Sequence, residues 1–306
     1  MASPQVASTR ANGAETDSTS PDSSTVPYVF QVPLVSEHDV ERIFAKDLTP
    51  EEKALLNSSE YNALNFTAEQ LLPYAFEMFR ALNLIEEFSL SIATLQTLLV
   101  KTQRSYRTPP FHNFHHAFTV AQMVFLFLKR YELSKALGPQ STLVLLLSAI
   151  FHDIDHNGLS NTYHTTCKTP LALTYNNNCP LESHHAHCAK TLLKDTRLLD
   201  HLSEHQAILE SISVCILGTD MSRHFSLVDE FKSNLDSMRD FSSQGKEQRN
   251  LLLSILLKAA DISNEARPWS VSLPWADALQ TEFFQQVCDH VSTFLCLQFL
   301  SEDCTV

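Results

Sequence analysis

Histidines gather in one part of the sequence, and their spacing could hold divalent metal ions. Nine of the 14 histidines lie between His112 and His187, about a quarter of the chain. Two pairs are spaced four residues apart, His112 with His116 and His152 with His156. Residues four apart share one face of an α-helix, so each pair could converge on one centre. The spacing therefore predicts a site for metal binding or for acid–base chemistry.

The second pair follows the apolar run 143–151 and encloses two aspartates, Asp153 and Asp155. A helix of that composition is buried, and unpaired ionised carboxylates at its end would be costly, so a partner cation is implied. Imidazole with carboxylate ligands suits zinc, manganese or iron, whereas carboxylate with water suits magnesium.

A further aspartate, Asp261, ends another apolar run, 251–260, and Asp220 follows Ile216-Leu217 in the same way. A histidine, a His-Asp pair and a distant aspartate are the ligand set of HD-type metallohydrolases. The other histidines of these segments are each predicted to be ordinary hydrogen-bonded residues. They are His115, His164, His184, His187 and His290.

Apolar residues recur at three- and four-residue spacing, which predicts helices over 71–82 and 91–100. The segments 118–131, 142–152 and 250–262 are apolar all round, as central helices are. Only 5 glycines are present. Their scarcity argues against Gly-rich phosphate loops and against hairpin-rich folds. The predicted fold class is all-α, a compact multi-helix HD-type metallohydrolase domain.

The composition also bears on partners and location. A net charge of −13 disfavours nucleic acid and anionic membrane surfaces as main partners. The longest apolar run is about half of the ~20 residues that span a bilayer, so no membrane span is predicted, and no signal peptide is apparent. Seven cysteines without a CxxC pair indicate a reducing, cytoplasmic location. Oligomeric state is not predicted.

Five sequence motifs stand in order along the chain. They are Phe-His-Asn-x-x-His-Ala at 111–117, Ala-Ile-Phe-His-Asp-Ile-Asp-His at 149–156, Leu-Glu-Ser-His-His at 181–185, Gly-Thr-Asp-Met-Ser-Arg-His at 218–224 and Lys-Ala-Ala-Asp-Ile-Ser-Asn at 258–264. In these motifs the chain resembles the catalytic domain of the class I cyclic nucleotide phosphodiesterases. The resemblance runs from Tyr61 to Gln286, and 110–114 and 261–268 are most similar to the high-affinity cGMP-specific branch.

The resemblance implies a role for each motif residue. The first metal, usually Zn²⁺, would be bound by His116, His152, Asp153 and Asp261. Asp153 would bridge to a second metal, Mg²⁺ or Mn²⁺, held otherwise mostly by waters, and His112 would protonate the leaving oxygen. Groups that orient these ligands and waters would be His156, Glu182, His185, Thr219 and Asp220. The nucleotide pocket would be lined by Phe111, Met221, Ile262 and Asn264.

The implied activity is hydrolysis of a 3′,5′-cyclic nucleotide, cGMP or cAMP, to the 5′-nucleotide. A hydroxide bridging the two metals would attack phosphorus in line. Two alternatives stay open, another HD-type phosphohydrolase such as a nucleotidase, and an inactive form that acts as a binding or regulatory protein. The long histidine motif and the Thr-Asp-Met-Ser block weigh against the first, and the intact ligand set weighs against the second.

The sequence departs from the family pattern in three places. Thr119 replaces an aspartate that is not a ligand, and Ser183 replaces an asparagine, which is expected to loosen the positioning of water. The third departure lies beyond Gln286, where nothing matches the Gln-x-Gly-Phe that holds the purine in the family. The predicted organisation is therefore a disordered tail at 1–27, a catalytic domain at 28–286 and a divergent or truncated C-terminal segment at 287–306. The last segment is interpreted as a variant terminus or as a genuine short form.

Overall fold

A computed structural model of the chain describes residues 27–236 and 245–302, and the side chains of these up to Val287. All regular elements in these ranges are helical, so the predicted all-α fold is confirmed. The α-helices are α1 (Glu37–Ile43), α2 (Pro50–Leu56), α3 (Leu72–Ala81), α4 (Leu84–Glu87), α5 (Ile92–Ser105), α6 (Phe114–Arg130), α7 (Leu133–Phe151), α8 (Asn161–Thr166), α9 (Pro170–Thr174), α10 (Pro180–Thr196), α11 (His205–Leu217), α12 (His224–Asn234), α13 (Lys246–Asp261) and α14 (Trp269–Glu302). Short 3₁₀ helices are η2 (Ala63–Asn65), η3 (Met221–Arg223) and η6 (Ile262–Ala266).

Each of the five segments predicted to be helical contains a helix, and the differences lie at the ends. α3 covers the segment predicted at 71–82, whereas α5 and α13 run a few residues beyond their predicted segments at one end. α6 begins at Phe114, four residues before the predicted start, because the Asn113 side chain caps it. Hydrophobic periodicity locates the buried face of a helix well, but it does not indicate where a polar first turn begins.

α7 is the most apolar part of the core and has a kink near its start. Gly138 has φ 76° and ψ 167°, which breaks the helix just before Pro139. By length and composition α7 is the one helix in the described ranges that could cross a membrane. However, 61 % of its apolar window is buried inside the protein, as expected of a core helix.

The centre of the molecule is a group of four helices. α6 packs along α7, α11 packs against α7, and α13 contacts α6, α7 and α11. α10 packs in turn against α11. Buried side chains such as Phe118, Phe125 and Phe151 fill the space between them. This rigid centre matters for function because α6, α7 and α13 each deliver a chemically important residue at one end.

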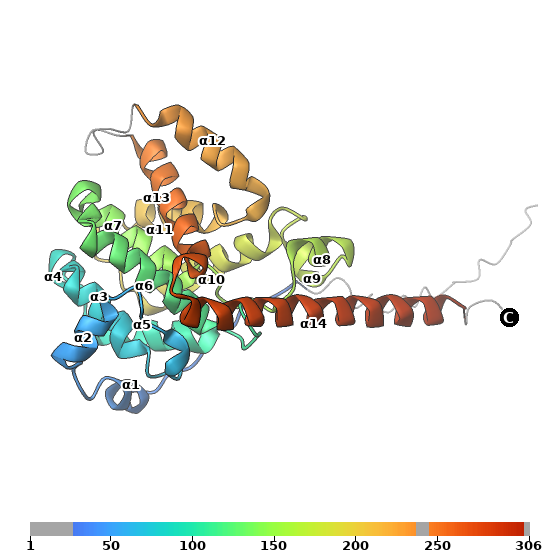
Figure 1. Ribbon diagram of the computed structural model, residues 1–306, viewed down its shortest axis with the longest axis horizontal. Coiled ribbons are helices and arrows are strands. Elements are labelled where there is room, and N and C mark those ends of the chain that lie inside the picture. The colour runs from blue at the N-terminus through green and yellow to red at the C-terminus, as the bar shows by residue number, and fades with distance from the viewer. Residues whose placement is uncertain (1–26, 237–244, 303–306) are drawn as a thin grey trace, which may run out of the picture.

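The last helix lies differently from the others. α14 projects beyond the group of helices as a single long rod (Figure 1), and its N-terminal part contacts η6. The boundary predicted after Gln286 falls inside α14. Residues 1–26 of the predicted tail lie outside the described part of the chain.

Candidate active site

The start of α6 places the first two histidines. Asn113 is the N-cap, and its side-chain oxygen accepts hydrogen bonds from the backbone N–H groups of His115 and His116. His116 therefore lies in the first helical turn, buried and 1 % exposed. His112 precedes the helix, so the prediction that His112 and His116 share a helix face is wrong. Their rings nevertheless lie 5.7 Å apart, because the cap folds the chain back at this point.

The second pair is also not helical. α7 ends at Phe151, and Asp155 has φ 64°, a left-handed conformation that aspartate tolerates better than most residues. This turn sends His152 and His156 to different neighbours, so the prediction that they converge on one centre is wrong. His152 faces His116, whereas His156 stacks on His112 with ring centroids 4.2 Å apart.

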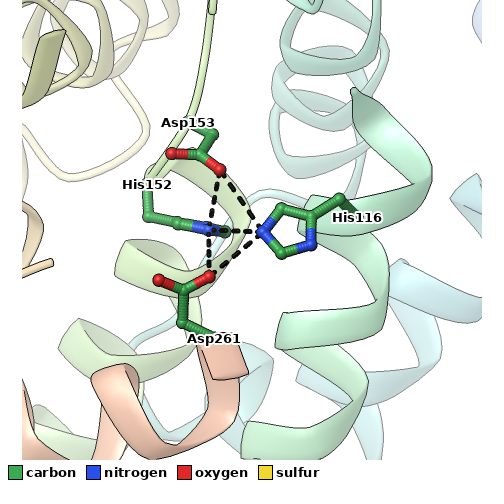
Figure 2. Close-up of side chains that lie close together, drawn as sticks. All are labelled: His116, His152, Asp153 and Asp261. Atoms are coloured by element: carbon green, nitrogen blue, oxygen red, sulfur yellow. Dashed lines mark hydrogen bonds and ion pairs between the residues drawn. The ribbon is translucent and has the colours of Figure 1, made fainter. Parts of the chain in front are cut away.

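Four side chains from three helix ends meet at one point (Figure 2). Nε2 of His116 lies 3.2 Å from Nε2 of His152. Oδ2 of Asp153 lies 3.3 and 3.2 Å from these two nitrogens, and Oδ1 of Asp261, the last residue of α13, lies 3.1 and 3.3 Å from them. The structure thus brings together all four residues predicted to bind the first metal.

The electrostatics of this cluster suit a cation. Burial alone would lower the pKa of His152, but Asp153 and Asp261 outweigh it and raise that pKa well above its usual value. Burial would likewise raise the pKa of both aspartates, and the His152 imidazole instead holds them below their usual range. Two imidazoles and two ionised carboxylates therefore face one another, and a divalent cation would displace the shared protons.

The geometry of the donor set also fits a metal ion. The carbonyl of Ala149 lies 2.9 Å from Nδ1 of His152 and accepts its proton, which leaves Nε2 as the ligand atom. Ligand atoms that surround Zn²⁺ at about 2.0–2.2 Å lie roughly 3–3.6 Å from one another. The five distances within the cluster, 3.1–3.3 Å, fall in this range.

Beside the cluster, His112 is held by a carboxylate. Its Nδ1 pairs with Oε1 of Glu282 from α14, and Oε2 of Glu282 accepts the backbone N–H groups of Phe111 and His112 at 2.8 and 3.0 Å. Burial alone would lower the pKa of His112, but Glu282 and Asp153 raise it above its ordinary value. A histidine that keeps its proton beside an anionic site has the properties of a general acid.

A pocket of 640 Å³ opens over the cluster. His112, Asp153 and Asp261 form part of its lining. The four residues predicted to contact the nucleotide also line it, and they are Phe111, Met221, Ile262 and Asn264. Met221 and Ile262 are 61 % and 52 % exposed, so the pocket offers open apolar surface next to its charged floor.

The residues predicted to orient ligands all line the same pocket. They are His156, Glu182, His185, Thr219 and Asp220. Burial lowers the pKa of His185 to about 4, and its Nδ1 donates to the carbonyl of Ile154, 2.7 Å away. Burial raises the pKa of Glu182 to about 7, and Asn161 donates to its carboxylate at 2.8 Å. These contacts hold the walls of the pocket in place.

Among the site residues that sequence reasoning missed, three lie on α14, and they are Trp275, Leu279 and Glu282. They lie four and three residues apart on one face of α14, and all three are within or beside the pocket. That helical spacing was the available signal. Ser183, the departure expected to loosen the positioning of water, donates to the carbonyl of Asn178 at 2.9 Å, just before α10.

An all-α domain in which two histidines and two aspartates converge beneath a pocket has the architecture of an HD-type metallohydrolase. The chain belongs to the 3′,5′-cyclic nucleotide phosphodiesterase family, whose sequence pattern matches residues 111–293. It is 37 % identical over 261 residues to a high affinity cGMP-specific 3′,5′-cyclic phosphodiesterase 9A of Drosophila melanogaster, and 35 % identical over 243 residues to the human protein of that name.

Solved structures agree with this assignment. The phosphodiesterase domain of the RhoPDE fusion protein from the choanoflagellate Salpingoeca rosetta superposes with a TM-score of 0.74 and 30 % identity. The match covers 83 % of this chain and 79 % of that one. The two curated matches cover 83 % and 78 % of this chain but only 17 % of the Drosophila protein and 40 % of the human protein. The chain therefore spans less than half the length of these relatives.

Proposed function

We propose that the chain hydrolyses a 3′,5′-cyclic nucleotide to the 5′-nucleotide. The observation that carries the proposal is the convergence of His116, His152, Asp153 and Asp261 on the floor of a pocket whose edge holds the paired His112 and Glu282. A cation-binding floor next to a protonated histidine is what an anionic phosphodiester with a poor leaving group requires.

His116, His152, Asp153 and Asp261 would hold the first cation, Zn²⁺ by the nature of the ligands. Asp153 lines the pocket and would extend to a second cation, Mg²⁺ or Mn²⁺. When bound, the two cations would lower the pKa of a water and neutralise charge on the phosphoryl oxygens.

His112 would supply the proton. The Glu282 carboxylate occupies Nδ1, so Nε2 is the nitrogen that remains for the leaving 3′ oxygen. The raised pKa of His112 keeps the imidazolium populated, and general acid help of this kind is worth about 10²–10⁴-fold in rate.

The substrate end of the pocket would hold the base. Phe111 and Ile262 offer apolar surface to a purine, and Asn264 offers an amide within the same lining. We favour cGMP over cAMP, because the Drosophila and human relatives are named cGMP-specific. A cytoplasmic location is part of the proposal, since Cys179, Cys188 and Cys215, in the described part of the chain, are thiols and not halves of a disulfide.

The test is a hydrolysis assay of the purified, folded chain with cGMP, cAMP and a 5′-nucleotide in the presence of zinc and magnesium. Turnover of a cyclic nucleotide is expected, with cGMP preferred. Turnover of the 5′-nucleotide alone would instead indicate a nucleotidase. Binding without turnover of any of the three would indicate a binding protein.

A further inference from the structure

The segment that precedes α1 contacts α9 and α10 with its first residues and α5 with its last ones. Residues 27–36 have no regular secondary structure, and the carbonyl of Leu34 accepts a hydrogen bond from Arg104 of α5 at 3.2 Å. At the other end, the backbone N–H of Tyr28 donates to Oγ1 of Thr174 at 3.0 Å. The Tyr28 ring packs edge-on against His184, with centroids 4.8 Å apart. Tyr28 is thus fixed by its backbone and by its ring.

The hydroxyl of Tyr28 reaches Asp155, where three donors meet. Tyr28 donates to Oδ2 of Asp155 at 3.1 Å, and Nε2 of His184 donates to the same oxygen at 2.8 Å. Nε of Arg107 donates to Oδ1 at 2.6 Å, and Arg107 also contacts the Tyr28 oxygen. The carboxylate of Asp155 is 12 % exposed, so these groups enclose most of it. Burial and the Asp155 charge raise the pKa of Tyr28 to about 12, which keeps its hydroxyl a donor.

Asp155 matters because of its place in the chain. It is the left-handed residue of the turn after α7, and the turn bond from the N–H of His156 to the carbonyl of Asp153 spans it at 3.1 Å. A non-glycine residue in this conformation needs its surroundings to hold it there. Two neighbouring histidines of α10 hydrogen-bond to this turn. His184 donates to the carboxylate of Asp155, and His185 donates to the carbonyl of Ile154.

We propose that Tyr28 is a positioning residue for the metal centre, because its hydroxyl completes the donor set of Asp155 and so fixes the turn that carries Asp153 and His156. Tyr28 is neither part of the pocket lining nor a member of the four-residue cluster. Its hydroxyl acts on the turn through Asp155, both directly and through Arg107, which pairs with the same carboxylate. The hydroxyl, rather than the ring, is the part that the centre needs.

The experiment compares Tyr28→Phe with the wild-type protein. Residues that orient metal ligands typically contribute 10–100-fold to metal affinity. We expect Tyr28→Phe to weaken zinc binding, measured by competition with a chelator, by roughly 10-fold. Hydrogen exchange at the amides of His156 and Gly158 is expected to speed up. Because Tyr28 is outside the nucleotide pocket, kcat should fall while KM stays the same, and Tm should change little.

The matched control is Tyr131→Phe, which changes the same atom at a tyrosine that is 65 % exposed at the end of α6. It should match the wild type in every measurement. Zinc affinity and amide exchange equal to wild type in Tyr28→Phe would overturn the positioning role. So would a lower Tm with exchange accelerated throughout the chain, because that is a general loss of stability. The positioning role of Tyr28 rests on the proposed function. If the wild-type protein neither binds zinc nor hydrolyses cyclic nucleotides, the proposed function itself is wrong.

Discussion

The imidazole of His112 is paired through Nδ1 with the carboxylate of Glu282, 170 residues further along the chain. The second oxygen of Glu282 accepts the two backbone N–H groups of Phe111 and His112. One buried carboxylate therefore fixes both the orientation of the ring and the path of the backbone before α6. The same contact ties α14 to the edge of the metal centre.

This pair predicts the alkaline side of the pH–rate profile. The acid form of His112 is the active form, and its pKa is raised above the ordinary histidine value of 6.5. Activity should therefore persist above pH 6.5 and fall only as the pH rises through the raised pKa. In Glu282→Gln the negative partner is gone, so the alkaline limb of kcat should move to lower pH. The measurement is kcat for cyclic nucleotide hydrolysis between pH 5 and 10.

Asp277→Asn is the control for that experiment, because Asp277 is an exposed carboxylate on the same helix. Its profile should coincide with that of the wild type. An unchanged alkaline limb in Glu282→Gln would mean that His112 does not set it.

Removing the general acid should separate catalysis from metal binding. His112 lies outside the four-residue cluster, so His112→Asn should keep its bound zinc. Its kcat should fall by about 10²–10⁴-fold, the usual contribution of a general acid. Metal analysis and steady-state kinetics on the same sample provide the check. Loss of zinc together with activity would assign His112 to the metal site instead.

Asp261→Ala should remove zinc and activity together. Asp261 is one of two carboxylates that contact both His116 and His152, so its loss leaves the cluster without half of its negative charge. A ligand that binds only the folded state stabilises it by about 2.7 kcal/mol at 100 times its Kd. The wild type should therefore lose Tm when zinc is chelated, and the variant should not. Retained zinc in the variant would show that the cluster is not the metal site.

The fold was predictable where its causes are local. The apolar period of α3 and α5 is visible in the sequence, since each helix buries one face against the core. The ends were less predictable, because they depend on single polar residues. Asn113 starts α6 earlier than the apolar pattern does, and the left-handed Asp155 excludes a helix through 152–156.

The candidate site was predictable to the extent that its residues lie in short motifs. His152 and Asp153 follow a buried helix, and Asp261 ends another, so the charges stood out against an apolar background. The contact of Glu282 with His112 and that of Tyr28 with Asp155 could not be predicted from the sequence. Each joins segments more than 100 residues apart, and nothing local in either segment specifies which surface it will meet.

Arg267 should be the most important buried cation for stability. It is 5 % exposed, and it donates to the carbonyls of Tyr61 and Thr119 at 3.1 Å and to Gln122 at 2.7 Å. Burial lowers its pKa to about 10, so it is still charged at neutral pH. Arg267→Met would leave these acceptors unpaired and should cost about 3 kcal/mol in urea unfolding. The exposed Arg249→Met should cost less than about 0.5 kcal/mol, and equal losses would contradict this role.

Two glycines with positive φ offer a matched pair for testing how closely α14 is packed at the site. Gly158 has φ 80°, and a Cβ there would lie 3.1 Å from Cβ of Pro109 and 3.5 Å from Cγ of Glu282. Gly138 has φ 76°, and a Cβ there would meet no atom within 4 Å. Alanine at either position should cost about 1–3 kcal/mol in backbone strain.

Only Gly158→Ala should add a packing penalty, because the new methyl group presses on the segment before His112 and on its carboxylate partner. We therefore expect Gly158→Ala to be destabilised more than Gly138→Ala in urea unfolding. We also expect its kcat to fall, since displacing Glu282 disturbs the ring of His112. Gly138 lies in the kink of α7, away from the pocket, so Gly138→Ala should keep the wild-type kcat. If the two variants lose equal stability and both keep full activity, then the close packing of Gly158 against Pro109 and Glu282 has no part in holding the general acid in place.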